Sequence, residues 1–428
     1  MSLKNPGYSK KYRAYVLLVL TGVYTFNFID RQILVILQQS IKSDLGLSDT
    51  QLGLLTGFAF ALFYVTMGIP IARLADRSNR KNIIALALAV WSAMTAISGF
   101  VQNYWQLLLA RIGVGIGEAG GSPPAHSIIS DYFPAEKRAT ALAIYSIGIY
   151  IGILFGYLFG GWIDQYFGWR TAFLVIGIPG IIYALLVLFT VKEPVRGQLD
   201  IHTHNKNPLE LKEVTRLLLS YKTFIYLSFA AGLTAFGSYG VGNFSPPFLY
   251  RVHELDSATI GTWLSFTTGI GGGLGTFAGG YLADRLGRQD VRWYCWISVI
   301  AGILKFIPGT IFFFLDHTLT VLIATFFSTF LTGIYLGPTI AVIHNLVIAK
   351  MRAFASAILF FVLNLVGLGF GPLVIGMISD WLEPVYGSTS LRWAFTFSYI
   401  SGTLAIILFY KAGQHYPKDL ATVQNKQL

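Results

Sequence analysis

Charged residues are scarce in this sequence, and several features that enzyme chemistry would need are missing. Asp, Glu, Lys and Arg make up 12% of the 428 residues, about half of the roughly 25% that is usual in soluble domains. The single cysteine excludes an internal disulfide. No His, Cys or Asp residues are spaced like metal ligands, and no nucleophile–base pair is apparent. The sequence therefore predicts no metal, no cofactor and no enzyme activity.

Long hydrophobic runs fill most of the chain instead. Hydrophobic residues make up 54% of it, and a helix of about 20 apolar residues spans a bilayer. These runs are too long and continuous for barrel strands, so the sequence predicts an all-α, multi-pass integral membrane protein. The first run carries Asp30 and Arg31 and lacks a small-residue cleavage site, so we expect an uncleaved helix there. The twelve predicted spans are about 14–38, 51–72, 83–101, 105–130, 140–163, 171–191, 223–249, 258–282, 293–314, 318–346, 354–379 and 392–411.

The basic residues predict the orientation of these helices. With a cytoplasmic N-terminus, 24 of the 31 Lys and Arg fall on the cytoplasmic side, and both termini are then cytoplasmic. The net charge of +11 is thus mainly a topology signal. No soluble domain offers a basic face, so we expect no nucleic-acid partner. Three cations are left inside the predicted membrane spans, namely Arg31, Arg111 and Lys305.

Two stretches of the chain nearly repeat each other. Each has an Asp-Arg pair where an apolar run ends in a basic cluster, and the two aspartates, Asp76 and Asp284, lie 208 positions apart. Further matches in the same order indicate a duplicated membrane half, which is the architecture of a secondary transporter. These matches are 138–141 with 352–355, and 170–173 with 392–395.

The duplication predicts three parts. Residues 1–192 form an N-terminal six-helix bundle, 193–221 a cytoplasmic linker, and 222–428 a C-terminal six-helix bundle. The second part of the linker predicts an amphipathic surface helix, with Asn207 as its N-cap and Pro208 in its first turn. Its apolar face would consist of Leu211, Val214, Leu217 and Leu218.

The repeated loops resemble those of the major facilitator superfamily. That superfamily carries a D-R-x-G-R pattern between helices 2 and 3 and again between helices 8 and 9. The second copy matches well, whereas Ala72 and Asn79 stand in the first copy where glycine is common. Segment 111–119 resembles the superfamily's R-x-x-x-G-x-G pattern in helix 4. The resemblance covers the whole chain and implies twelve transmembrane helices in two pseudo-symmetric six-helix bundles.

A narrower resemblance is to the Spinster family of lipid transporters within that superfamily. It rests on segments 27–31, 75–81 and 115–119, and it is best over about residues 24–170. The resemblance implies transport of lysophospholipids or sphingoid phosphates. The chain looks like a bacterial homologue, so we expect a monomer in the bacterial inner membrane, in contact with membrane lipids.

The charges inside the membrane are the main candidates for function. A charge at mid-membrane costs about 2.5–3.5 kcal/mol on insertion scales, so each needs a reason to be there. Asp30 and Glu118 are the two acidic residues that lie deep in the apolar runs. Asp30 and Arg31 are adjacent and point about 100° apart on a helix, so Arg31 can meet a different partner. In the superfamily, helices 1 and 4 both line the central cavity, where Asp30 and Glu118 could face each other.

These residues suggest separate roles in headgroup binding and in proton coupling. We expect Arg31, with Asn27 one turn earlier on the same face, to hold an anionic headgroup. Asp30 or Glu118 would carry the coupling proton, because a carboxyl that alternates between burial and contact with an arginine can bind and release one. Arg111 is a further candidate for proton coupling, although it lies roughly 10 Å along the helix axis from Glu118. The alternative is a static ion network that fixes helix packing.

The second half of the chain offers few polar groups for a substrate. In the seventh span, Tyr239 and Asn243 lie on one face and are the candidate substrate contacts there. The other wall residues are mostly aromatic, so a charged first-half wall would oppose an apolar second-half wall. Pro123–Pro124 and Pro246–Pro247 should break or bend the fourth and seventh spans.

The two Asp-Arg loops are candidate gates. The superfamily resemblance implies that they hold the two halves together on the cytoplasmic side and favour the outward-open state. The candidate gating residues are Asp76, Arg77 and Arg80 in the first copy, and Asp284, Arg285 and Arg288 in the second.

The sequence thus predicts a secondary active transporter. Its substrate would be an amphipathic anionic or zwitterionic lipid, moved by alternating access and coupled to protons. A proton-coupled transporter of a soluble organic anion is the main alternative, although it would need more polar groups in the second half. A multidrug exporter fits less well, because Arg31 would repel cationic drugs. A membrane receptor that transports nothing is an alternative of another class.

Overall fold

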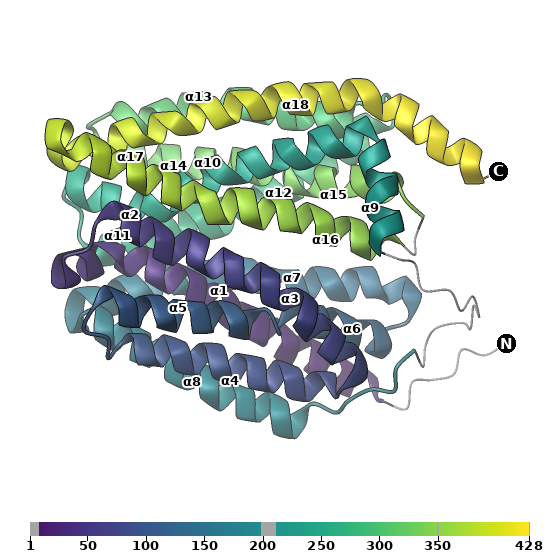
Figure 1. Ribbon diagram of the computed structural model, residues 1–428, viewed down its shortest axis with the longest axis horizontal. Coiled ribbons are helices and arrows are strands. Elements are labelled where there is room, and N and C mark those ends of the chain that lie inside the picture. The colour runs from purple at the N-terminus through teal and green to yellow at the C-terminus, as the bar shows by residue number, and fades with distance from the viewer. Residues whose placement is uncertain (1–7, 198–210, 349–350, 428) are drawn as a thin grey trace. The chain divides into compact units, whose positions relative to one another are not determined.

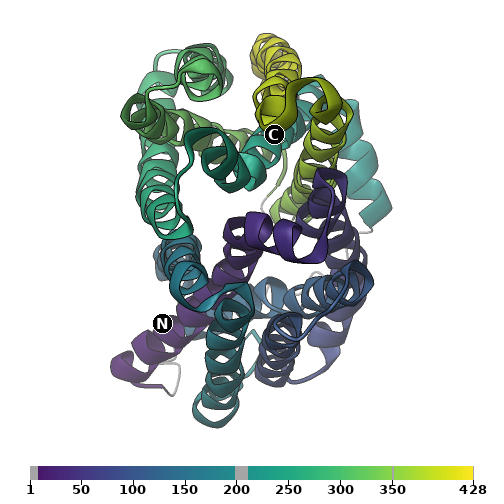
Figure 2. The same cartoon turned by 90° about the vertical axis from the view of Figure 1, so that its left-hand side faces the viewer.

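The structure, a computed structural model, describes residues 8–197, 211–348 and 351–427. Most residues in these ranges are helical, and no strand occurs in them (Figure 1). The all-α fold predicted from the apolar runs is confirmed. Within each compact unit described below, most helices run in roughly one direction, and Figure 2 shows many of them nearly end-on.

The described helices pack into two compact units, and each unit is discontinuous in sequence. Unit 1 comprises Met1–Leu47, Ala59–Lys206 and Asp256–Ser265, and unit 2 comprises Ser48–Phe58, Asn207–Leu255 and Phe266–Leu428. The helices of unit 1 are α1 (Lys10–Leu45), α3 (Ala59–Arg77), α4 (Arg80–Ser98), α5 (Tyr104–Glu118), α6 (Ser122–Tyr132), α7 (Ala135–Phe167), α8 (Trp169–Thr190) and α11 (Ser257–Leu264).

Unit 2 holds the remaining elements, together with all but the first residue of η2. They are α2 (Asp49–Gly53), η1 (Leu54–Phe58), α9 (Leu211–Ser220), α10 (Lys222–His253), η2 (Ser265–Ile270), α12 (Gly271–Gly287), α13 (Trp293–Phe314), α14 (Thr318–Gly333), α15 (Leu336–Asn345), α16 (Arg352–Val362), η4 (Leu363–Gly369), α17 (Phe370–Tyr386), η5 (Gly387–Thr389) and α18 (Ser390–Gln427).

Every predicted span lies in helical elements, but several spans are interrupted. Nine stretches within the described ranges are long and apolar enough to cross a membrane. The fourth and eighth predicted spans are not among them: the fourth is divided between α5 and α6, and the eighth runs through α11, η2 and α12. The eleventh and twelfth predicted spans fall together in one stretch, Phe354–Val423. The helices thus follow the predicted runs, and the interruptions mark places where the chain departs from a regular α-helix.

Two of these interruptions coincide with the passage of the chain from one unit to the other. The π-helical segment η1 ends at Phe58, and unit 1 resumes at Ala59. The π-helical segment η2 begins at Ser265, and the chain passes from unit 1 to unit 2 directly after this residue. Isolated π-helical turns inside α-helices are frequent at functional sites. The second span therefore belongs partly to unit 2 and partly to unit 1, and the eighth span is divided between the units as well.

Local sequence signals explain how α1 ends and α2 begins. Gly46 has φ +64°, the left-handed conformation that glycine adopts without strain, and it ends α1. Two residues later Ser48 forms a capping box with Gln51 and starts α2. Residues 46–48 alone thus separate α1 from α2.

Proline has different effects in the fourth and seventh spans. The fourth span breaks between Glu118 and Ser122, and its prolines lie at the start of α6, where proline is tolerated. In contrast, α10 continues through Pro246 and Pro247. Of the predicted break or bend, the break does not occur in the seventh span, since packing of a helix against its neighbours can hold it helical despite a missing backbone bond.

Glycine lets α7 approach α1 closely within unit 1. A Cβ atom added at Gly152 would lie 2.5 Å from Cβ of Phe28, and one added at Gly148 would lie 2.7 Å from the carbonyl oxygen of Thr21. Small residues at four-residue spacing permit such crossings in membranes. This contact fixes the rotation of α1 and hence the direction of the charged residues it carries.

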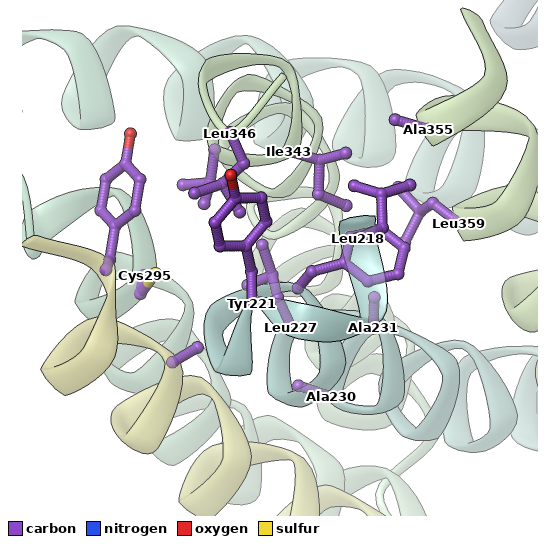
Figure 3. Close-up of a cluster of buried hydrophobic side chains, with 14 of the residues drawn as sticks. Leu218, Tyr221, Leu227, Ala230, Ala231, Cys295, Ile343, Leu346, Ala355 and Leu359 are labelled. Carbon is purple, nitrogen blue, oxygen red and sulfur yellow. The ribbon is translucent and has the colours of Figure 1, made fainter. Parts of the chain in front are cut away.

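The predicted linker helix is observed as α9, which packs on unit 2. Val214 and Leu218 are fully buried in a cluster that also contains Leu227 of α10, Ile343 of α15 and Leu359 of α16 (Figure 3). Arg216 and Ser220 of α9 are exposed, as the amphipathic pattern predicts. The N-cap predicted at Asn207 lies outside the described residues.

Candidate substrate site

A buried charged cluster joins α1 and α5 inside unit 1. Nε of Arg31 donates to Oε2 of Glu118 at 2.8 Å. The Glu118 side chain is fully buried and that of Arg31 is 16% exposed. The sequence alone did not determine which residue pairs with Arg31, and the structure shows that it is Glu118.

Asp30 and Arg111 belong to the same cluster, although neither takes part in that pair. Both are buried, with 2% of each side chain exposed. The Asp30 carboxyl lies close enough to interact electrostatically with Glu118 and Arg111. Asn27, one turn before Arg31, is also buried and interacts with Glu118. All five predicted residues of the first half thus meet in one place.

Three aromatic rings surround the guanidinium of Arg31. Its Cζ atom lies 5.0 Å from the ring centre of Phe28, 4.9 Å from that of Phe60 and 5.0 Å from that of Tyr64. Each distance is within the range of a cation–π contact. The sequence analysis missed this aromatic cage, because Phe60 and Tyr64 come from α3 and only the packing of α3 against α5 brings them to α1.

Several polar atoms in the cluster have no hydrogen-bond partner within the described part of the protein. They are Oδ1 of Asn27, Oδ1 of Asp30, Nε and Nη1 of Arg111, and Oε1 of Glu118. A buried polar atom without a partner costs about 1–3 kcal/mol. Such a concentration in one place is unfavourable for a purely structural network, and it leaves donors and acceptors that a bound group or a proton can satisfy.

The sequence of α5 explains how Glu118 reaches this position. A Cβ at Gly117 would lie 2.8 Å from the backbone nitrogen of Trp91, and one at Gly115 would lie 3.0 Å from the carbonyl oxygen of Phe60. These glycines therefore let α5 pack directly against α4 and α3. Glu118 is the last residue of α5, so the carboxylate lies at the break in the fourth span.

The two candidates from the seventh span lie in unit 2. Tyr239 is partly buried and packs against the apolar cluster of that unit. Asn243 is 8% exposed, and its amide donates a long hydrogen bond, 3.5 Å, to the carbonyl of Thr56 in η1. Their contact with a substrate stays a prediction.

The first-copy gating candidates have different surroundings. Arg80 is buried, and it pairs with Asp131 at 2.5 Å and with Glu193 at 2.6 Å. Its Nη1 and Nη2 also donate to Ser127 and to the carbonyl of Pro194. This network lies inside unit 1 and joins three elements of it. Arg77 is exposed at the end of α3, and the side chain of Asp76 lies outside the described residues.

The second-copy candidates lie at the exposed end of α12. Asp284 accepts a hydrogen bond of 2.8 Å from the hydroxyl of Tyr294, which belongs to the same unit. Arg285 and Arg288 are exposed. The gating role of the two loops stays a prediction, but the structure shows that Asp284 and Arg80 each have a partner within their own unit.

A second ion-pair network, in unit 2, was missed by the sequence analysis. Both terminal nitrogens of Arg251 donate to the carboxylate of Asp49 at 2.7 Å, and the hydroxyl of Ser379 donates to it as well. Asp380 accepts hydrogen bonds from the backbone of Asp49 and Thr50, so it caps the N-terminus of α2. These residues lie at helix ends, where charge is common, and the sequence carried no signal that paired them.

Comparison with known proteins identifies the family. The family model of the Major Facilitator Superfamily matches residues 20–306 and 227–426. An "MFS-type efflux pump" of Mycolicibacterium smegmatis is 36% identical over 409 residues, which are 94% of this chain and 93% of the relative. The "Sphingosine-1-phosphate transporter SPNS2" of Danio rerio is 28% identical over 404 residues, covering 88% and 79% of the two chains.

A solved structure gives the same result at the level of the fold. The crystal structure of a bacterial homologue of the human lysosomal transporter Spinster, in an inward-facing and unoccupied conformation, matches with a TM-score of 0.87. The match has 31% sequence identity and covers 96% of this chain and 99% of the other. The chain thus belongs to the major facilitator superfamily, is related to the Spinster proteins, and is an integral membrane transporter of a small-molecule substrate rather than an enzyme.

Proposed function

We propose that this transporter moves an amphipathic anionic or zwitterionic lipid, of the lysophospholipid or sphingoid-phosphate kind, by alternating access coupled to protons. The observation that carries the proposal is the buried pair of Arg31 and Glu118 beside a second buried carboxyl, Asp30. A guanidinium presents a planar fork of donors that suits a phosphate group. One of those donors, Nε, is taken by Glu118.

The headgroup and the proton are linked through Arg31. Protonation of Glu118 removes the negative charge that holds Arg31, and a phosphate can then take its place. Removing one partner of a buried ion pair is strongly unfavourable when the other charge is left alone. In this proposal Glu118 therefore gains a proton when Arg31 binds the headgroup, and Glu118 loses the proton when the headgroup leaves. Asp30 and Arg111 adjust the charge of the cluster.

In this proposal the aromatic cage contacts the part of the lipid next to the headgroup. Phe28, Phe60 and Tyr64 lie about the guanidinium and offer apolar faces beside a charged group. In this proposal Asn27 assists Arg31, and Tyr239 and Asn243 contribute from unit 2. A phosphate-bearing lipid also appears in the name of the Danio rerio relative, which is a sphingosine-1-phosphate transporter.

The remaining expectations from the sequence complete the proposal. We place both termini on the cytoplasmic side, on the strength of the basic-residue bias. The resemblance to a bacterial Spinster homologue supports a monomer in a bacterial inner membrane. The duplicated halves are residues 1–192 and 222–428, joined by the linker 193–221. Asp76, Arg77, Asp284, Arg285 and Arg288 act at the cytoplasmic gate, together with Arg80, whose buried network anchors its end of the first half.

Flux in proteoliposomes tests the proposal. The purified chain is supplied with radiolabelled lysophosphatidylglycerol or, as a soluble anion, gluconate. We expect lysolipid transport that falls at least about tenfold in Arg31→Ala, since hydrogen bonds to charged groups contribute roughly 1.5–3 kcal/mol. Arg31→Lys should recover little of it, because the fork of donors is lost. Arg170→Ala is the matched control, since Arg170 pairs with Asp44 at an exposed site.

A second variant guards against misfolding. Arg31→Ala alone leaves the Glu118 carboxylate buried, whereas Arg31→Ala combined with Glu118→Gln removes both charges and should fold as well as the parent chain. Undiminished lysolipid transport in that double variant would rule out Arg31 as the headgroup ligand. Transport of gluconate without lysolipid would favour the soluble-anion alternative.

A further inference from the structure

A cavity of about 490 Å³ lies apart from the charged cluster, where the C-terminal end of α7 meets the start of α11 in unit 1. Its principal lining residues come from both helices and from the cap that precedes α11. They are Trp162, Gln165, Tyr166, Asp256, Thr259 and Trp263. The proposed function assigns no role to it.

Aromatic faces form much of the wall. The ring centres of Trp162 and Tyr166 lie 5.8 Å apart with a tilt of 36°. The indole nitrogen of Trp162 donates to Oγ1 of Thr262 at 3.0 Å, which fixes that ring against α11. Trp162 is 48% exposed and Tyr166 is 66% exposed, so part of each side chain is open to a ligand.

The cavity carries one formal charge among its described lining residues, and this charge is negative. Asp256 is the N-cap of α11, and its carboxylate accepts hydrogen bonds from the backbone nitrogen and the hydroxyl of Thr259. Partial burial acts to raise the pKa of Asp256, but the hydrogen bonds from Thr259 outweigh it and lower the pKa below its usual value. The carboxylate therefore stays ionised near neutral pH, and no Lys or Arg lines the cavity to neutralise it.

We propose that this cavity binds a trimethylammonium group, as carried by a phosphocholine headgroup. Aromatic faces attract such a cation through their quadrupoles and also contact its methyl groups, and the recognition of quaternary ammonium ligands commonly uses such cages. The Asp256 carboxylate supplies the opposite charge, while Gln165 and Thr259 offer polar contacts to the remainder of the headgroup. An anion finds no cation in this wall. The proposal is independent of the role given to Arg31.

The headgroup can belong to a lipid or to a solute, and the test separates these sources. The full chain is placed in nanodiscs of phosphatidylglycerol, which contain no choline. Equilibrium binding is then measured with radiolabelled glycerophosphocholine, which has no tails, and with radiolabelled lysophosphatidylcholine. Tetramethylammonium is the competitor, since it presents the cation alone.

Two substitutions address the cavity and two serve as controls. Asp256→Asn removes the charge yet keeps a good N-cap, so the start of α11 should be preserved. Trp263→Ala removes an aromatic wall. We expect each to weaken probe binding about three- to tenfold, because the first removes the opposite charge and the second removes an aromatic face. Trp105→Ala, at an exposed tryptophan on α5, and Asp290→Asn, at a partly exposed carboxylate of unit 2, should leave this binding unchanged.

The outcomes separate this proposal from the previous one. Loss of glycerophosphocholine binding in both cavity variants supports a headgroup site open to solutes. The same loss seen with lysophosphatidylcholine alone supports a lipid site. If neither probe shows a component that depends on Asp256 and Trp263, the proposal is overturned, whatever the Arg31 variants do to transport.

Discussion

The interiors of the two units differ in the charge that they bury. In the described part of unit 1, Asp30, Arg111 and Glu118 are all buried among apolar helices. In the described part of unit 2, Asp49, at the start of α2, is the one charged residue that is fully buried, and the other buried polar residues carry neutral side chains such as Ser, Thr and Asn. Most of the buried charge in the described residues thus lies in unit 1.

This difference bears on the proposed function. Buried charge is costly in a membrane, so its concentration in unit 1 supports the proposal that headgroup binding and proton exchange take place there. The interior of unit 2 is mostly apolar instead, as in the buried cluster around Leu227 and Leu359.

The largest effect that would test this division is expected from the carboxyls of unit 1. We expect the double variant Glu118→Gln, Asp30→Asn to lose pH-gradient-driven accumulation of substrate while it keeps substrate exchange at zero gradient, since amides cannot carry the proton. Accumulation should fall to the level of empty vesicles. Flux into proteoliposomes with and without a pH gradient measures both quantities. Full pH-driven accumulation in this variant would place the coupling elsewhere or show that transport is not proton-driven.

A second comparison sets the two repeated loops against each other. Arg80→Ala should destabilise the protein by about 3–5 kcal/mol, because it leaves Asp131 and Glu193 without their buried partner. In the second copy Asp284→Ala removes a hydrogen bond at an exposed site, and a net loss of about 0.5–1.5 kcal/mol is expected. Thermal unfolding in one detergent compares them. Equal losses in the two variants would contradict the asymmetry that the structure shows.

A smaller effect is expected from the substrate candidates in unit 2. Asn243→Ala should reduce lysolipid transport less than Arg31→Ala does, by about two- to tenfold, because a neutral hydrogen bond contributes roughly 0.5–1.5 kcal/mol. Tyr239→Phe removes a hydroxyl and keeps the ring, so its effect should be no larger. A loss in either variant that matched Arg31→Ala would show that unit 2 shares in headgroup binding.

The smallest predicted effect concerns the pH dependence of stability at the start of α11. The pKa of Asp256 is lowered in the folded protein, so its contribution is fully present above the ordinary value near 3.9 and is lost as pH falls through the folded value. Asp256→Asn should abolish this part of the acid dependence and should change stability at neutral pH by a few tenths of a kcal/mol, about the difference between good N-caps. Unfolding midpoints at pH 7 and at pH 3.5 measure it, with Asp290→Asn as the control.

The sequence by itself determined the class of this protein and most of its helices. Hydrophobic runs of sufficient length must become helices in lipid, because each backbone group has to be paired within its own segment. The repeated Asp-Arg loops showed the duplication, and the cost of intramembrane charge singled out Asp30, Arg31 and Glu118. These inferences needed only local composition and spacing.

Only the tertiary structure decided which of these residues meet. Arg31 and Glu118 are 87 positions apart, and their pairing depends on the close glycine contacts that orient α1 and α5. The aromatic cage includes residues of α3. The apolar pattern of α3 does not show whether a side chain faces the core, the lipid or the site. Arg80 looked like a surface gate in the sequence and is buried by Asp131 and Glu193. Spacing along a helix fixes a direction, but contact between helices depends on packing, to which every side chain at the crossing contributes.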